Sequence, residues 1–472
     1  MELLLLVIII VVLLPALLLF YLSNPKSEGP LKAYPLIGSM LQFIKHRHRL
    51  LEWQTELLAA TPTSTLHIRL FGKQQGIITA NPANLEHVLK SNVPDGGLPR
   101  PGITNVEGEL WKRQRKALSY EFSTRTLRIF VEGIVQREVT RRLLPLLRRA
   151  AASGAAVDIQ DVLERYGFDN VCQVAFNEDP ACLATEGRIP PAGGGSRRGS
   201  PPPSGRHRHH RLPLPKLLNV GSEKRLRESI STLNDFARSV IRSRKEKLRS
   251  PAAEAEGLRH QDLLSRFIAG EDNSDEFLRD IVVNLILAGQ ETTSSALTWF
   301  FWSCRRDPLG EDKKQGGEEG EQSFGFDELK EMTYLHAAIT EAMRLYPPVP
   351  WNSSYCLADD VLPDGTKVGK GWFDGGSVGE DFGEFRPERW LGPGGEFRAE
   401  SPFRFPAFHG GARSCLGKEM AYLQMKSMAA CLIERFTLDV VGGGGRPEML
   451  LSTSLRVKGG LLVRVRERTT PR

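Results

Sequence analysis

Hydrophobic and polar positions alternate along the chain with two periods, and the helical period dominates. It predicts helices over residues 81–88, 109–119, 126–150, 159–174, 222–248, 275–302, 328–345 and 416–436. Residues 66–70 and 76–79 flank a Gly-containing turn and predict a β-hairpin. A second turn is expected at 363–365, and strand-like stretches occupy 450–465. We therefore expect a mainly α fold with small antiparallel β-sheets.

The amino terminus carries a run of 20 uncharged residues, 3–22. A helix of that length spans about 30 Å, the thickness of a bilayer core. A cleaved secretory signal is the alternative, but the run exceeds the usual length of about 7–15 residues and only Glu2 precedes it as a charge. Basic residues follow the run, which places the remainder in the cytosol. We predict a single transmembrane anchor at 1–23, a Pro-containing linker at 24–35 and a folded body at 36–472.

Composition narrows the class of protein. Hydrophobic residues make up 40% and charged residues 25%, which excludes a wholly disordered or fibrous chain. The formal net charge of +7 fits an anionic membrane surface or an acidic partner better than a dedicated nucleic-acid binder. Six widely spaced cysteines predict reduced thiols in a cytosol-facing domain. Residues 180–215 are of low complexity and are expected to be disordered, and their His-rich tract resembles a solvated basic segment more than a metal site.

The strongest chemical signal, at 408–417, lies directly before the last long predicted helix. A cysteine at a helix amino terminus faces free N–H groups and the positive end of the dipole, and both favour thiolate over thiol. Gly411 and Gly417 would let a flat ligand approach the backbone, and Arg413 is placed to meet an anionic group. A lone cysteine is usually a small buried hydrophobe, but these neighbours favour ligand binding by Cys415.

The pattern Phe408-x-x-Gly411-x-Arg413-x-Cys415-x-Gly417 resembles the haem-thiolate signature of the cytochrome P-450 monooxygenases. The resemblance implies that Cys415 is the axial ligand to haem iron and that Arg413 contacts a haem propionate. It also implies that the other signature residues line the haem b cofactor. A thiolate ligand donates electron density and promotes O–O cleavage. The implied architecture is the P-450 fold behind a single transmembrane helix.

A second signal lies in the long predicted helix at 288–293, with the sequence AGQETT. Apolar residues on several faces indicate burial, where Gly289 costs about 1 kcal/mol relative to alanine. The polar groups of Glu291 and Thr292 also carry a cost there. A helix split by a cap at Thr292 or Thr293 is the alternative. In the family such a segment crosses the haem, opens a groove for O2 and relays protons. By resemblance, Glu291 and Thr292 carry those roles.

A third signal pairs Glu341 and Arg344, which share a helical face at i, i+3 spacing. An exposed pair of this kind is common and contributes only about 0.2–0.5 kcal/mol. The segment at 385–389, FRPER, is similar to the family's second arginine motif. The resemblance implies that Glu341, Arg344 and Arg389 form a buried network with a structural role on the haem side of the core.

A fourth signal pairs Trp111 and Arg115, which share one helical face at i, i+4 spacing. A basic surface helix is the alternative. The family's W-x-x-x-R helix supplies both residues to a haem propionate. Three other basic residues of this helix would then face outward as a docking surface for an acidic reductase: Lys112, Arg113 and Lys116.

Four further stretches, at 298–302, 334–338, 356–365 and 405–409, resemble plant fatty-acid-hydroxylating members of the family. The resemblance implies insertion of one atom of O2 into a C–H bond of a fatty acid or of a jasmonoyl–amino acid conjugate. Electrons would come from NADPH through an NADPH–cytochrome reductase. We expect a single-pass protein of the endoplasmic reticulum membrane with a cytosolic catalytic domain, in contact with membrane lipid and a lipophilic small-molecule substrate, and without a nucleic-acid partner.

Four segments depart from the family pattern. Residues 93–104 are short for the loop over the distal pocket, 180–215 replace a helix that normally roofs the substrate channel, and 305–323 are Gly- and Glu-rich where a helix is expected. Residues 372–385 are expected to lack the helix and strand before the second arginine motif. A degenerate membrane-bound haem binder without turnover is therefore an alternative. A third class, haem-thiolate isomerases or dehydratases that use peroxides, is disfavoured by the proton-relay segment.

Overall fold

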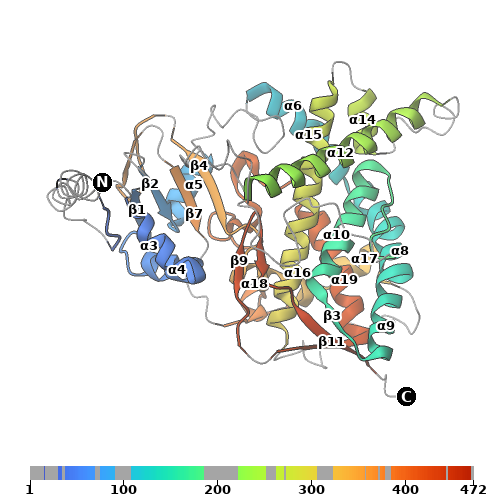
Figure 1. Ribbon diagram of the computed structural model, residues 1–472. Coiled ribbons are helices and arrows are strands. Elements are labelled where there is room, and N and C mark those ends of the chain that lie inside the picture. Colours follow the sequence, from blue (N-terminus) through green and yellow to red (C-terminus); the bar gives the residue numbers. More distant parts are fainter. Residues whose placement is uncertain are drawn as a thin grey trace, which may run out of the picture. The chain divides into compact units, whose positions relative to one another are not determined.

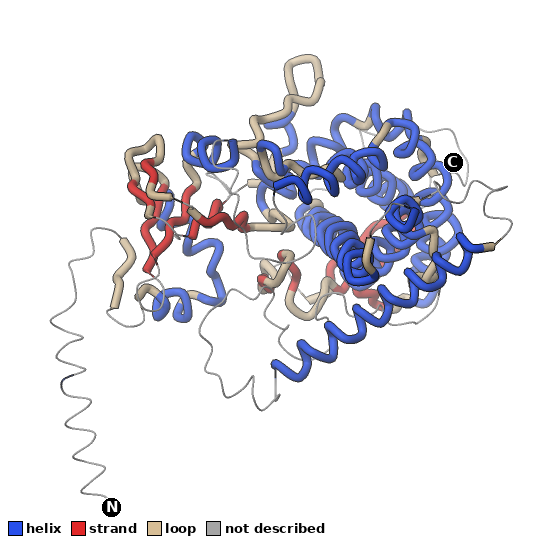
Figure 2. The backbone as a smooth tube through the Cα atoms, turned by 90° about the horizontal axis from the view of Figure 1, so that it is seen from above, coloured by secondary structure: helices blue, strands red, loops and turns tan. Residues whose placement is uncertain are grey.

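The computed structural model describes residues 15, 30–34, 38–69, 75–90, 108–184, 222–250, 262–269, 273–305, 323–356, 358–369, 373–377, 384–442 and 445–468. The chain divides into two compact units. Unit 1 lies within Met1–Gly97, Pro350–Asp381 and Ser401–Ser414. Unit 2 lies within Leu98–Val349, Phe382–Glu400 and Cys415–Arg472. Helices predominate over strands, as Figure 2 shows, so the prediction of a mainly α fold is confirmed.

Unit 1 is built around a four-stranded sheet of order β1-β2-β7-β4. Its strands are β1 Thr65–Arg69, β2 Gln75–Thr79, β4 Trp351–Tyr355 and β7 Phe373–Ser377. Strands β1 and β2 pair antiparallel, which confirms the predicted hairpin. The helices of this unit are α3 Met40–Lys45, α4 Leu50–Ala59 and α5 Pro82–Lys90, with short 3₁₀ turns at Arg47–Arg49, Pro406–Phe408 and Gly411–Arg413.

Two expectations for unit 1 are corrected by this sheet. No strand was expected within 372–385, yet β7 forms there and pairs with β4 on one side and β2 on the other. The β2–β7 pairing is parallel, whereas only antiparallel pairing was expected. Gly375 and Gly376 hide the strand from sequence because glycine disfavours strands, but backbone pairing on both edges outweighs that preference. The predicted turn at 363–365 joins β5 Asp360–Val361 to β6 Lys367–Val368.

Unit 2 contains the long helices. They are α6 Gly108–Ser119, α10 Ile159–Phe176, α12 Ser222–Arg249, α14 Leu263–Ala269, α15 Asp275–Ile286, α16 Thr292–Ser303, α17 Phe326–Glu331, α18 Thr333–Leu345 and α19 Lys418–Arg435. Helix α16 packs against α10, α18 and α19, and Figure 1 shows α10, α16 and α19 side by side. Their fully buried side chains include Tyr166, Trp299 and Phe300, so the core of unit 2 surrounds α16.

The predicted helix at 126–150 is a succession of shorter helical segments. It comprises α7 Thr124–Ile129, a π segment Phe130–Val135, α8 Gln136–Glu138, a second π segment Val139–Leu143 and α9 Leu144–Ser153. A 3₁₀ turn, Tyr120–Phe122, precedes them, and another, Pro387–Trp390, precedes the last helix. The strands of unit 2 are β3 Ala156–Asp158, β8 Phe436–Val440 and β11 Leu462–Glu467 in one sheet, and β9 Met449–Leu451 and β10 Leu455–Val457 in another.

Several predictions concern residues that the structure does not describe. The anchor at 1–23, apart from Pro15, lies outside the described residues, as do 93–104, 185–215 and 306–322. In the part of the chain that is described, we find no helix with the length and apolar character needed to cross a bilayer.

Candidate active site

Cys415 lies two residues before Gly417, the N-cap of α19, and its side chain is exposed. Protein atoms around the thiol desolvate it, which raises its pKa. A hydrogen bond from the Gly417 N–H and the charges of Arg115 and Lys418 act in the opposite direction but do not outweigh the desolvation. A coordinating metal ion deprotonates a thiol outright, so iron bound at this sulfur would hold it as the thiolate. An accessible sulfur with an N–H donor and two nearby cations fits the thiolate ligand of a haem iron.

Helix α6 contributes the predicted Trp111–Arg115 pair. The guanidinium carbon of Arg115 lies 5.6 Å from the centroid of the Trp111 ring, within the range of a cation–π contact. Both side chains are half-buried, and the charge of Arg115 acts on the Cys415 thiol. The structure therefore brings Arg115 and Cys415 into one electrostatic neighbourhood. The remaining basic residues of the helix, Lys112, Arg113 and Lys116, are exposed.

The earlier part of the signature belongs to unit 1. Phe408 and Arg413 are half-buried at the ends of two 3₁₀ turns. Gly411 has φ of +65°, and a Cβ there would lie 2.1 Å from the carbonyl oxygen of Leu89. Glycine is needed at 411 because α5 approaches the backbone, a reason that the flat-ligand interpretation missed. At Gly417, by contrast, a Cβ would make only ordinary contacts, the nearest at 3.6 Å from the Phe122 ring.

The segment AGQETT lies in a continuous helix. Helix α15 passes into a π segment, Leu287–Glu291, and then into α16 without a break. Thr292 has helical dihedral angles, and its Oγ1 donates to the Ala288 carbonyl at 2.6 Å. The alternative of a split helix capped at Thr292 or Thr293 is therefore wrong. Single-turn π segments occur frequently at functional sites.

Close packing against α10 explains the glycine of this segment. A Cβ on Gly289 would lie 2.8 Å from Cγ2 of Val171. Reciprocally, a Cβ on Gly167 of α10 would lie 3.1 Å from the carbonyl oxygen of Gln290. The two glycines let α10 and the π segment approach, so the cost of Gly289 is offset by helix packing.

Glu291 is 7% exposed and does not share partners with Thr292. The hydroxyl of Thr453 donates to its Oε2, and the hydroxyl of Ser454 lies 3.5 Å from the same oxygen. Burial raises the pKa of Glu291, against opposing contributions from Thr453, Arg456 and Ser454. Sequence reasoning missed these partners because they lie more than 150 positions away in the chain and carry no motif.

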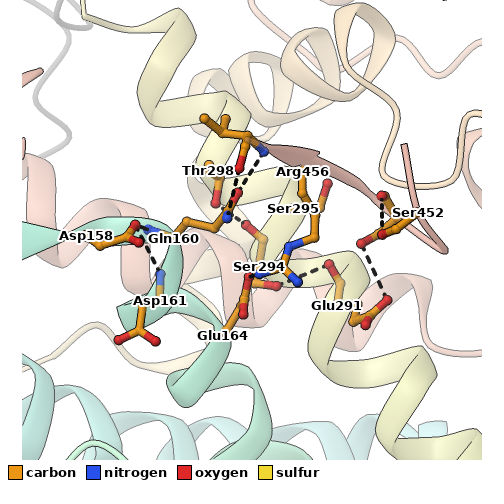
Figure 3. A network of polar contacts seen from close by, with 12 residues as sticks. Asp158, Gln160, Asp161, Glu164, Glu291, Ser294, Ser295, Thr298, Ser452 and Arg456 are labelled. Carbon is orange, nitrogen blue, oxygen red and sulfur yellow. Dashed lines mark hydrogen bonds and ion pairs between the residues drawn. The ribbon is translucent and has the colours of Figure 1, made fainter. Parts of the chain in front are cut away.

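The charged neighbours of Glu291 come from two elements, as Figure 3 shows. Arg456 of β10 forms an ion pair with Glu164 of α10. Burial raises the pKa of Glu164 to about 7, with Arg456 lowering it and Glu291 raising it. The buried Glu291 and the half-buried Glu164 thus share the influence of one arginine.

Glu341 lies at the centre of the predicted charge network. It is fully buried, and its two oxygens accept from Arg344 at 2.8 and 2.9 Å and from Arg389 Nε at 3.1 Å. The Trp390 indole N–H donates at 2.8 Å and the Arg386 backbone N–H at 3.0 Å. Burial alone would raise the pKa of Glu341, but these donors outweigh it and lower the pKa. The structure brings all three predicted residues together and adds Trp390, whose role the motif did not indicate.

Comparison with known proteins agrees with this arrangement. The family model described as Cytochrome P450 matches residues 29–463. Cytochrome P450 CYP94D108 from Paris polyphylla is 44% identical over 470 residues, covering 92% of this chain and 91% of the relative. Cytochrome P450 CYP94D109 from the same plant is 42% identical, with coverage of 87% and 88%. Cytochrome P450 94B1 from Arabidopsis thaliana is 39% identical, with coverage of 94% and 92%.

The match extends over nearly the whole chain and includes the thiol, the central helix and the charge network described above. The sequence identity between this chain and several relatives is high enough to establish common descent and a common fold. The family implies haem b as cofactor. The chain belongs to the cytochrome P450 family and is a cytochrome P450 monooxygenase.

Proposed function

We propose that this monooxygenase inserts one atom of O2 into an unactivated C–H bond of a fatty acid or fatty-acid-derived substrate, with electrons from NADPH through a reductase. The observation that carries the proposal is the exposed Cys415 thiol, which receives the Gly417 N–H next to Arg115 and Lys418. The substrate class rests on the similarity to plant fatty-acid-hydroxylating members. Haem b held at Cys415 would supply the activation of O2.

The chain's own residues would divide the remaining tasks. Trp111, Arg115 and Arg413 would bind the haem propionates, with Phe408, Gly411 and Gly417 lining the cofactor. Glu291 and Thr292 would hold and move protons toward the site of O2 reduction. The buried helix α16 would exclude water from one side, which strengthens every electrostatic interaction within the site.

Partners and location form part of the same proposal. The exposed cations of α6 would attract an acidic NADPH–cytochrome reductase, and attraction of this kind raises the rate of encounter. The anchor at 1–23 would hold the chain in the endoplasmic reticulum membrane as a single-pass protein with its catalytic domain in the cytosol. A lipophilic substrate would reach the site from the surrounding lipid.

The reduced, CO-bound absorption spectrum of the purified protein tests the thiolate. We expect the band of a thiolate-ligated haem, and its loss in Cys415→Ala. Absence of the band in the wild-type protein would refute the proposed ligation. The same protein, reconstituted with reductase and NADPH, is then assayed by mass spectrometry on fatty acids and on their hydroperoxides.

A hydroxylated fatty acid formed with consumption of NADPH supports the monooxygenase. Conversion of the hydroperoxide alone, without reductase, would indicate an isomerase or dehydratase instead. Haem uptake without any product would indicate the degenerate haem binder, which the departures from the family pattern motivate.

A further inference from the structure

Strand β10 is fixed between two helices. The carbonyl oxygen of Leu455 accepts from Ser295 Oγ at 2.5 Å and from the Trp299 indole N–H at 3.0 Å, both on α16. Two residues later, the backbone of Val457 exchanges two hydrogen bonds with the amide of Gln160 on α10, at 2.8 and 3.3 Å. All of these groups are buried. These hydrogen bonds fix the position of β10 relative to α16 independently of the side chains of the preceding turn.

The turn before β10 places one strong donor on Glu291. The hydroxyl of Thr453 donates to Oε2 of Glu291, whereas the hydroxyl of Ser454 is at 3.5 Å, the limit for a hydrogen bond. The third hydroxyl of the turn, on Ser452, donates within the turn to the Ser454 carbonyl at 3.0 Å. Thr453 is thus the turn residue that orients the carboxyl group, and Ser452 offers a matched control.

Charge in this region is unbalanced. In the part of the chain that the structure describes, Arg456 is the cation that acts on Glu291, and it is already paired with Glu164. Two further carboxylates, Asp158 and Asp161, act on Glu164 and disfavour its charge. Glu291 is buried and Glu164 is half-buried, and at both positions desolvation disfavours the charged carboxylate. One arginine therefore faces two carboxyl groups, and a proton on either of them relieves the imbalance of charge.

Resting on the proposed function, we propose that Glu164, Glu291 and Arg456 (Figure 3) form a cluster that holds one exchangeable proton. Thr453 is the positioning residue that aligns Glu291 and stabilises its charged form. Glu291 carries the proton-relay role in the proposed function. The turn before β10 and residue 164 of α10 would therefore set how readily the relay residue gives up its proton.

The inference predicts shifts of opposite sign. Thr453→Val removes a donor to the charged form, so the titration midpoint of the Glu291 carboxyl should move to higher pH. Glu164→Gln removes the competing carboxylate, so the charge of Arg456 then acts on Glu291 alone. The titration midpoint of Glu291 should therefore move to lower pH. Thr453→Ser keeps the hydroxyl and should restore the wild-type midpoint, and Ser452→Ala should leave it unchanged.

The midpoint is measured on the haem-loaded, full-length protein by pH-difference infrared spectroscopy, with Glu291→Gln identifying the carboxyl band. This readout requires no turnover. Coincident midpoints for wild type, Thr453→Val and Glu164→Gln would overturn the inference, as would a band that persists in Glu291→Gln. A normal CO-bound spectrum in each variant verifies its fold. If the valine variant does not fold, the shift predicted for Glu164→Gln still tests the inference.

A second measurement separates this inference from the proposed function. In reconstituted enzyme, Thr453→Val should lower the ratio of product formed to NADPH consumed by roughly tenfold, the effect of losing one hydrogen bond to a charged group, and Thr453→Ser should recover it. Shifted midpoints in a protein without monooxygenase activity would support the cluster but refute the proposed function. Active enzyme with unshifted midpoints would refute the cluster alone.

Discussion

Glu341 shows how a single buried charge is made tolerable. An isolated carboxylate in a protein interior is costly, but Glu341 receives donors from α18 and from the 3₁₀ turn Pro387–Trp390. Arg344 also donates to the Glu384 carbonyl at 3.2 Å, which ties the network to the chain before that turn. The carboxylate therefore connects two segments of unit 2 that are 45 or more residues apart.

We expect Glu341→Gln to lower the free energy of unfolding by about 3 kcal/mol, because it leaves the partly buried Arg344 and Arg389 without their counter-ion. Glu434→Gln, at a half-exposed residue paired with Arg435, should change it by at most about 1 kcal/mol. Denaturant unfolding at fixed haem occupancy measures both. Equal effects in the two variants would contradict a structural role for the network.

The sign of the pH dependence follows from the lowered pKa of Glu341. Its folded-state pKa lies below the ordinary value of 4.5, so its stabilising contribution is present above pH 4.5 and is lost as the pH falls through the folded-state pKa. In Glu341→Gln this part of the acid sensitivity should be missing. Unfolding measured from pH 6 downward in about half-unit steps compares the two slopes.

At the scale of elements, the π segment Leu287–Glu291 joins the two halves of the central helix. A π turn leaves carbonyl groups that the regular helical pattern does not satisfy. Hydroxyl groups donate to carbonyls of this segment: Thr292 to Ala288, and Ser294 to Gln290 and Glu291. Side-chain bonds of this kind often accompany a bend in a helix.

Gly289→Ala should be destabilising despite the better helix propensity of alanine. The added methyl meets Val171 at 2.8 Å, and β-branched side chains in helices have little rotamer freedom. Overpacking should lower the free energy of unfolding by about 1–3 kcal/mol, of which the helix propensity of alanine recovers about 1 kcal/mol. Val171→Ala in the same chain should remove the clash, which a double-mutant cycle measures as a favourable coupling energy.

Gly133→Ala is the matched control for that cycle. Gly133 also lies in a π segment, but a Cβ there would meet no atom within 4 Å. The substitution should raise stability by about 0.5–1 kcal/mol. A stabilising Gly289→Ala, or a zero coupling with Val171→Ala, would show that α10 can move away at no cost.

At the scale of the whole molecule, we expect the proposed anchor and the body to be separable because their driving forces differ. The run at 3–22 is expected to prefer lipid, whereas unit 2 has its own core around α16. We expect deletion of residues 1–23 to move the protein from the membrane pellet to the supernatant while the CO-bound spectrum remains. Sedimentation of expressed full-length and truncated chains measures this.

A heterologous apolar helix in place of 1–23 should return the truncated chain to the pellet. If the truncated chain still sediments with membranes, the body itself has a lipid-binding surface. Loss of the spectrum on truncation would instead mean that the amino terminus contributes to the folded body.

The regular elements were predictable because local pattern decides them. Apolar spacing placed α10, α12 and α19 within two residues at most ends, and the hairpin β1–β2 followed from its turn. Met332 divides the predicted helix at 328–345 into α17 and α18, a break that no proline or glycine marks. Strand β7 escaped prediction because its pairing partners come from distant segments.

In the candidate site, too, some features follow from local sequence and others from contacts between distant segments. Residue order by itself indicated the thiol at 415 with its flanking glycines. Resemblance to the family's short motifs indicated the roles of the AGQETT segment and of the charges at 341, 344 and 389. Only the tertiary structure decided that Gly289 faces Val171, that Gly411 meets Leu89 and that Thr453 and Arg456 act on Glu291. These contacts join residues far apart in the chain, and their geometry is set by helix and strand packing, which no local pattern encodes.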